Sequence, residues 1–222
     1  MTMAPGAHLP ANPLNIRLAI KHERLWWHVD DEDHLPERWD VSADIWELDL
    51  CPALYRHVGD ISLAIADLER ERNLLDSGVL GEWALEFIAE TVLDCADGRL
   101  HPELDAQLSS GPPRMVILQD VTLATAWRGY GLAGPLVAGA LRTLAPTARL
   151  AACRVSPLDF RDTTPDRVSA ELVALRMAAL LERIGFYRWR DVHVVDLRDP
   201  ALLDARMQLL THWWPSRHDE LS

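Results

Sequence analysis

Apolar and polar residues along the first half of the chain recur with the periods of strands and of one helix. Apolar residues at every second position predict strands, because successive side chains of a strand point to opposite faces. The segments with this pattern are residues 16–21, 25–29, 41–50 and 57–68. Apolar residues three and four positions apart predict a helix over residues 80–95. A long connection over residues 96–113 follows, and residues 102–108 within it predict a short helix.

The second half predicts strands and helices in alternation. Strands are expected at residues 115–124, 149–155 and 187–197, and helices at residues 132–144, 169–184 and 202–214. The middle helix has an apolar face that we assign to the core, made of Leu172, Leu175, Ala179, Leu180 and Ile184. This order predicts an α/β (α+β) fold, in which a mixed, mostly antiparallel, twisted sheet is flanked by helices.

A glycine-rich turn separates the strand at residues 115–124 from the helix that follows it. Gly129, Gly131 and Gly134 fall in this turn, next to Arg128. Glycine tolerates positive φ and lets a ligand approach the main chain without a Cβ in the way. The first amides of a helix have no intrahelical partner, and with the helix dipole they favour an anion. The turn therefore predicts a phosphate or pyrophosphate site.

The same turn resembles motif A of the GNAT superfamily of N-acetyltransferases, whose pattern is Q/R-x-x-G-x-G/A. The resemblance covers residues 126–134, with Gly129, Tyr130 and Gly131 as the G-x-G core. Ala126 stands where the family prefers Gln or Arg. In such a loop the main-chain amides hold most of the pyrophosphate, so the substitution leaves the resemblance in place.

A second segment resembles the family's motif B, in which a helix ends at Gly-Phe. It spans residues 181–186 and lies one predicted strand beyond the turn, as in the family. Leu181 occupies the position where many members have a tyrosine, and Arg154 stands near the place of a frequent asparagine. The early helix also departs from the family, which has two helices between its first two strands. Here the helix follows the early strands.

The resemblance implies a single GNAT-like domain with splayed central strands, and acetyl-coenzyme A or another acyl-coenzyme A as co-substrate. No metal is implied. Main-chain pairing with the pantetheine arm would involve Val121, Thr122 and Leu123. The pyrophosphate would contact the turn, at Arg128, Gly129, Tyr130, Gly131, Leu132, Ala133 and Gly134.

The residues that carry the chemistry are harder to assign. Asp120 interrupts an apolar strand, so its carboxylate either faces solvent or lines a cleft, where it would act as a base. Glu47 and Asp49, on one face of a predicted strand, are candidates for binding the amine. An acid for the leaving thiolate has to come from elsewhere than Leu181, and the candidates are Tyr187, Ser156 and Cys153.

Composition narrows the expected surroundings of the protein. Of 222 residues, 34 are acidic and 22 are basic, which gives a net charge of −12. We therefore expect no nucleic-acid partner, because phosphate contacts need clustered cations. Three dispersed cysteines, no signal peptide and no apolar run of membrane-spanning length predict a cytoplasmic protein without a membrane partner. Residues 1–13 predict a flexible arm and residues 14–222 one domain; a homodimer stays an open alternative.

The leading interpretation is an acetyl-coenzyme A-dependent N-acetyltransferase that transfers the acyl group directly to a small-molecule or peptide amine. Two alternatives remain. One is a protein of the same fold that binds acyl-coenzyme A without catalysis, which the missing tyrosine favours. The other is an α/β protein-interaction module, in which the glycine turn is structural and the Trp-rich N-terminal half is the contact surface.

Overall fold

A computed structural model describes residues 9–23, 36–47, 49–68, 83–94, 96, 98–161 and 163–213. Two expectations fall wholly or mostly outside these residues. They are the strand at residues 25–29 and most of the N-terminal arm.

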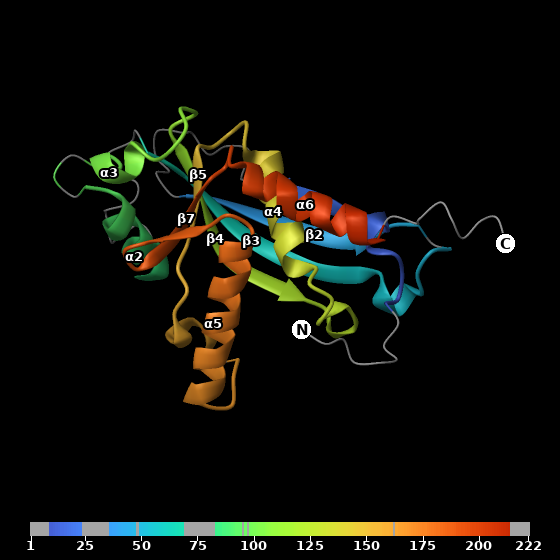
Figure 1. The fold of residues 1–222 in the computed structure, drawn as a ribbon. Coiled ribbons are helices and arrows are strands. Elements are labelled where there is room, and N and C mark those ends of the chain that lie inside the picture. Colours follow the sequence, from blue (N-terminus) through green and yellow to red (C-terminus); the bar gives the residue numbers. More distant parts are fainter. Residues whose placement is uncertain are drawn as a thin grey trace.

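One seven-stranded sheet runs through the molecule in the order β1-β2-β3-β4-β5-β7-β6 (Figure 1). The strands are β1 (Ile16–His22), β2 (Glu37–Ile45), β3 (His57–Asp67), β4 (Arg114–Leu123), β5 (Leu150–Cys153), β6 (Tyr187–Trp189) and β7 (Val192–Asp196). Among the described strands, only β4 and β5 pair in parallel, and the other neighbours are antiparallel. The predicted mixed, mostly antiparallel sheet is confirmed.

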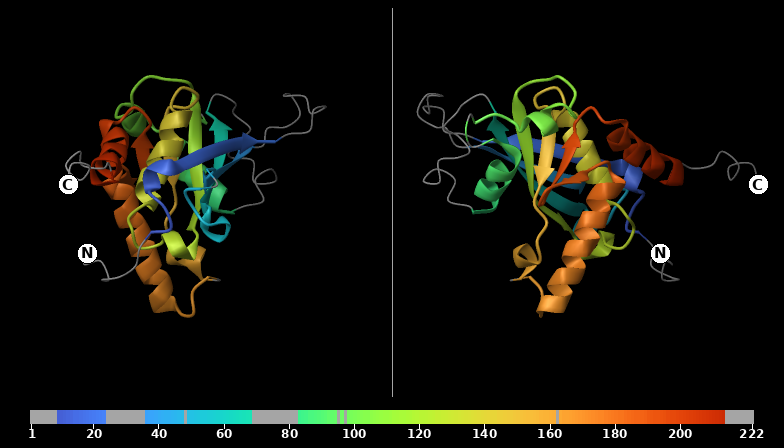
Figure 2. Two further views of the ribbon diagram at one scale, coloured as in Figure 1. Left: turned by 90° about the vertical axis from the view of Figure 1, so that its right-hand side faces the viewer. Right: turned by 60° about the vertical axis from the view of Figure 1, so that its left-hand side comes forward.

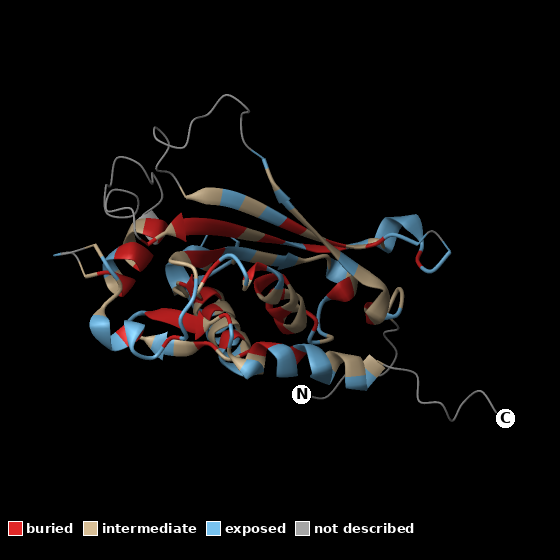
Figure 3. Ribbon diagram, turned by 90° about the horizontal axis from the view of Figure 1, so that it is seen from above, coloured by how far each residue is buried: buried red, intermediate tan, exposed pale blue. Residues whose placement is uncertain are grey.

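Helices cover both faces of the sheet, so it has an apolar core on each side. The described helices are α2 (Trp83–Val92), α3 (Pro102–Asp105), α4 (Ala133–Leu144), α5 (Arg167–Arg183) and α6 (Pro200–Trp213). Side chains of α4, α5 and α6 pack on one face, and those of α2 and α3 on the other. Strand β4 feeds both cores because its side chains alternate, Val116 into the first and Ile117 into the second. Figure 3 shows the buried residues along the middle of the sheet.

Along the chain, helix α2 follows β3 and precedes β4, as the sequence predicts. Two predicted strands need correction. The strand expected at residues 41–50 begins earlier, at Glu37, and ends at Ile45. The single strand expected at residues 187–197 is a hairpin of β6 and β7. Its turn contains Arg190, whose φ is +50°. This value lies in the left-handed region, so the chain cannot continue as one extended strand.

The core face assigned to the middle helix is partly wrong, although Leu180 and Ile184 do pack in the first core as predicted. In α5 the buried residues are Ala170, Ala174 and Leu181, whereas the side chains of Leu172 and Leu175 are exposed. The helix has apolar residues on two opposite faces, so periodicity alone does not tell which one packs. The alanine face packs inward, where small side chains allow a close approach. The first half of α5 extends beyond the sheet (Figures 1 and 2).

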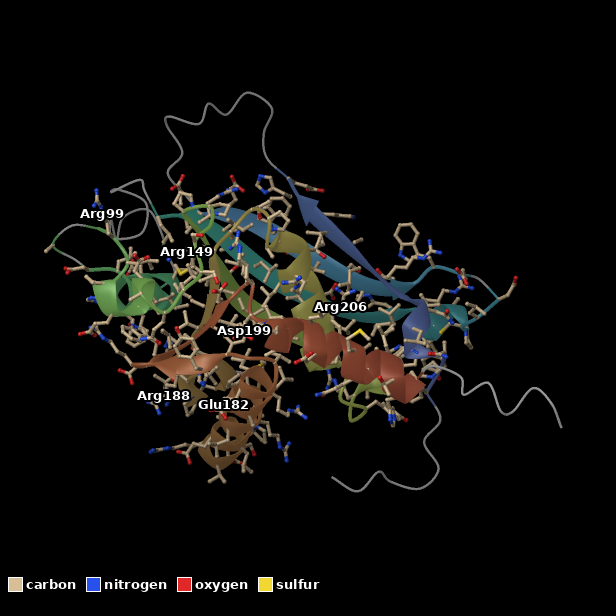
Figure 4. The ribbon with its side chains drawn as sticks, turned by 45° about the horizontal axis from the view of Figure 1, so that its top comes forward. Arg99, Arg149, Glu182, Arg188, Asp199 and Arg206 are labelled. Carbon is tan, nitrogen blue, oxygen red and sulfur yellow. The ribbon has the colours of Figure 1, made fainter. Side chains whose placement is uncertain are left out.

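Arg149 holds the connection between α3 and β4 against the start of β5 (Figure 4). Its guanidinium donates to the main-chain oxygens of Ser109 at 2.6 Å, Asp105 at 3.1 Å and Leu108 at 3.1 Å, and it pairs with the Asp105 carboxylate. Its side chain is 17% exposed. A mostly buried cation with these partners ties the main chain of the connection to the sheet.

We predict that Arg149→Met lowers the free energy of unfolding by about 2 kcal/mol, because charged hydrogen bonds are lost and carbonyl acceptors are left unpaired. The matched control is Arg167→Met, which removes an arginine that is 90% exposed and pairs only with Glu171 one turn away. That change is expected to cost less than about 0.5 kcal/mol. Urea denaturation of both variants measures the difference. Equal losses would contradict a structural role for Arg149.

Candidate functional site

The parallel pairing between β4 and β5 stops early. It covers only Met115 to Ile117 on β4, although β4 continues to Leu123. Within the described residues, no strand pairs with the β5-side edge of β4 from Leu118 onward. The predicted splay of the central strands is confirmed. An open edge presents main-chain N–H and C=O groups that need partners.

A β-bulge lies where the splay begins. In the β3–β4 ladder Leu63 pairs with Leu118 and Ser62 with Asp120, so Gln119 is an inserted residue. A bulge bends its strand and increases the local twist. The bulge therefore supplies a physical reason for β4 to diverge from β5 at this point.

A cavity of about 310 Å³ lies in the splay. Its apolar lining comes from α2, β4, the 3-10 helix η4 (Pro157–Phe160) and α5, and includes Leu85, Ile88, Leu118, Phe160 and Met177. Polar residues of its lining include Asp120, Arg154 and Asp159. The cavity thus adjoins the open edge of β4 and combines apolar walls with a few charged groups, as is common for small-molecule sites.

The glycine turn follows β4 directly and has the predicted form of strand, turn and helix. Gly129 and Gly131 have φ values of +86° and +75°, in the region that other residues rarely adopt. A Cβ built on either would have no atom within 4 Å, so the space in front of both is open. Both glycines are exposed, and among the described contacts their amides donate to no protein acceptor. The turn therefore fits a pyrophosphate, which needs close approach and amide donors.

Two side chains of the turn hold it in place through hydrogen bonds to the main chain. The indole N–H of Trp127, a fully buried residue, donates to the main-chain oxygen of Tyr55 at 2.9 Å. Arg128 Nε donates to the main-chain oxygen of Leu123 at 2.7 Å, so it braces the turn against the end of β4. A rigid turn presents its amides in one arrangement, which lowers the cost of binding an anion.

Charged groups at the β5 end of the cavity were not recognised from the sequence as a site. Arg154 Nη1 pairs with Asp159 Oδ1 at 2.7 Å, and the Arg154 side chain is only 8% exposed. Asp159 Oδ2 also accepts from the Ser156 amide at 2.8 Å, as part of a capping box that begins η4. The spacing of Ser156 and Asp159 is a local signal for that cap. Its position beside the cavity depends on the tertiary fold.

Cys153 stands next to this pair and lines the cavity. Burial raises the pKa of its thiol to about 12, and the negative charge of Asp159 acts in the same direction. A protonated buried thiol is a small apolar wall rather than a nucleophile.

Of the predicted catalytic and substrate-binding residues, Asp120 lines the cavity, whereas Tyr187, Glu47 and Asp49 do not. Asp120 lines it and accepts a hydrogen bond from Thr122 Oγ1 at 2.8 Å. Tyr187 does not line it: its ring packs against the core under α2, and burial raises the pKa of its phenol. Glu47 and Asp49 lie beyond the end of β2 and do not line it either, and Glu47 pairs with Arg17 at 2.9 Å. Their roles in catalysis or binding stay predictions.

Comparisons with known proteins find solved structures of low sequence identity to this chain. No protein-family model and no curated protein matches the chain. Among solved structures it is similar to YhbS from Escherichia coli, described as a GNAT family N-acetyltransferase in complex with CoA, at 15% identity and a TM-score of 0.37 over 84% of this chain and 85% of that one. A point mutant of KacT is similar at 11% identity and a TM-score of 0.36, over 84% and 98%. The cleft and the glycine turn of this chain are therefore the features that bear on its function.

One expectation about partners is wrong. The acidic composition led us to expect no nucleic-acid partner. A structure similar to this chain, at 12% identity and a TM-score of 0.34 over 88% of this chain and 99% of the other, is a KacTA complex with DNA. Net charge is a poor ground for such an exclusion, because contacts with phosphate depend on local cations.

Among the described residues, no helix is both long and apolar enough to span a membrane.

We predict that Cys153 resists alkylation in the native protein. With a pKa of about 12, on the order of one thiol in ten thousand is ionised at pH 8. Iodoacetamide at pH 8 should leave the Cys153 peptide unmodified in native protein and label it in guanidinium chloride, as read by mass spectrometry. Rapid labelling of the native protein would contradict a buried, protonated Cys153 thiol.

Proposed function

We propose that this protein binds an acyl-coenzyme A in the splay between β4 and β5 and transfers the acyl group to an amine. One observation carries the proposal: β4 has an open edge from Leu118 onward and ends in a turn with exposed amides. A single continuous stretch of main chain thus offers partners for two different parts of one ligand. The cavity lies at the inner end of that stretch.

The open edge suits the amide-containing arm of coenzyme A. The main chain of Val121, Thr122 and Leu123 would pair with the two amides of pantetheine, as with an added strand. The pairing satisfies groups that the splay leaves open. It also directs the arm along β4, with the thioester toward Leu118 and the cavity.

The turn suits the pyrophosphate. The residues from Arg128 to Gly134 would surround it with main-chain amides at the start of α4, including Tyr130, Leu132 and Ala133. Helix α4 begins without a side-chain cap, since Leu132 makes no capping hydrogen bond. A bound phosphate would take the place of that cap and interact favourably with the helix dipole.

Transfer needs a neutral amine, because its lone pair forms the new C–N bond while the C–S bond breaks. Asp120 lines the cavity and would accept the proton from the amine, directly or through water. The acyl carbonyl would lie near the β4 main chain at the bulge, where amides can stabilise its developing negative charge. The thiolate leaves as product and takes its proton from solvent. Because the amine attacks the thioester directly, no covalent enzyme intermediate is needed.

A second candidate is an acyl-coenzyme A-binding protein without catalysis. It is favoured by Leu181, which stands where many family members have the tyrosine acid and is fully buried in the first core. No acid can act from that position. Thiol release from acetyl-coenzyme A in the presence of a panel of primary amines separates the two candidates: release supports transfer, and binding without release supports the non-catalytic protein.

Coenzyme A binding should be lost in Gly131→Glu and in Gly129→Glu, because a carboxylate would fill and repel the anion site. Positive φ makes either substitution strained, so the matched control is Gly98→Glu, which introduces the same side chain at a φ of +68° in the connection after α2. Isothermal titration with coenzyme A up to millimolar concentration should show binding only by wild type and Gly98→Glu. Normal binding by both turn variants would refute this placement of the pyrophosphate.

Asp120→Asn should lower kcat/KM for acyl transfer by about a hundredfold, because general-base assistance contributes on the order of 10²–10⁴ in rate. Its effect on the Kd of coenzyme A should be small. Asp60→Asn on the neighbouring strand is the control, since Asp60 is exposed and does not line the cavity. Equal rates for wild type and Asp120→Asn would remove Asp120 from the mechanism.

A further inference from the structure

The cavity at the inner end of the cleft is larger than an acetyl group needs. Its volume of about 310 Å³ corresponds to roughly ten water-sized volumes of ~30 Å³ each. The carbonyl, the methyl group and an attacking nitrogen together fill about three or four of these. Space for several further heavy atoms remains.

The cavity also has a direction along β4. Its lining runs from Val121, nearest the glycine turn, to Ile117, a distance of about 13 Å at ~3.3 Å per residue. Asp120 and Val121 lie at the outer end, where side chains are exposed or half-buried. At the inner end Ile117 packs with Leu85 and Ile88 of α2 in the second core, and all three are buried. A donor arm that enters along β4 reaches the apolar end last.

The walls beyond the thioester position are mostly apolar. Ile88 comes from α2, Phe160 from η4 and Met177 from α5. The Cys153 thiol is protonated and adds a further apolar surface. Arg154 and Asp159 pair with each other, and Asp159 also caps η4, so this pair is held by the protein itself. These walls suit a hydrocarbon chain better than a polar substituent.

We infer that the donor is a coenzyme A thioester of a saturated acyl chain longer than acetyl, of about four to eight carbons. This inference rests on the proposed function and specifies its substrate. The chain occupies the apolar part of the cavity formed by Leu85, Phe160 and Met177, and the amine approaches from the side of Asp120. Each added methylene that enters the cavity leaves water for an apolar surface.

The test is the dissociation constant of each member of a series of coenzyme A thioesters, namely acetyl, butyryl, hexanoyl, octanoyl and dodecanoyl. No acceptor amine is needed. Kd should fall by about fourfold per methylene, the equivalent of burying one CH₂, until the cavity is full, and should stop falling or rise beyond about eight carbons. A Kd that is independent of chain length, or tightest for acetyl, would overturn the inference.

Two variants separate the cavity from general attraction of long chains to apolar surface. Met177→Trp fills the cavity and should reduce the preference for hexanoyl over acetyl by at least tenfold. Met207→Trp adds the same side chain on α6, where Met207 is 49% exposed, and should leave the preference unchanged. Equal effects of the two substitutions would contradict a chain site in this cavity.

The series also distinguishes failure of this inference from failure of the proposed function. If no thioester and no coenzyme A binds, the proposed function is wrong. If coenzyme A and acetyl-coenzyme A bind and longer chains bind more weakly, the function stands and the chain-length inference is wrong.

Discussion

Strand β4 pairs with β5 over three residues and then continues paired with β3 alone, and the rest of the site depends on that divergence. The inserted residue Gln119 bends β4 at the point where the pairing ends. The divergence opens the edge of β4, makes room for the cavity and leads the chain into the glycine turn. An unpaired edge in the middle of a sheet leaves main-chain groups unsatisfied, so a ligand with amides of its own is a natural complement.

The features that could be predicted from the sequence are those set by local constraints. Gly129 and Gly131 have the positive φ values for which glycine is suited, and the helix that follows them begins within one residue of its expected start. Strand β3 is also close to its predicted bounds because Ile61, Leu63 and Ile65 alternate along it. Such patterns depend on residues that are close together in the chain, so they can be recognised in a single sequence.

The features that could not be predicted depend on residues far apart in the chain. Apolar residues on two faces of α5 leave the choice of face to the shape of the sheet, and the alanine face around Ala174 packs inward. The cavity walls come from α2, β4, η4 and α5, so no local motif marks Phe160 or Met177 as site residues. Asp120 was recognisable as a polar residue in an apolar strand, but its place beside the cavity follows from the bulge.

Any catalysis at this site depends first on binding of coenzyme A along β4 and the glycine turn. Leu181, which stands in the position of the usual acid, is buried and has no proton to donate. The thiolate therefore has to leave unprotonated, which its low basicity allows, and is protonated by solvent. The most direct measurement is amide hydrogen exchange with and without coenzyme A. The account predicts slower exchange in peptides that cover Val121–Leu123 and Gly129–Gly134, with little change in β1 and β2. Protection elsewhere, or none at saturating coenzyme A, would contradict it.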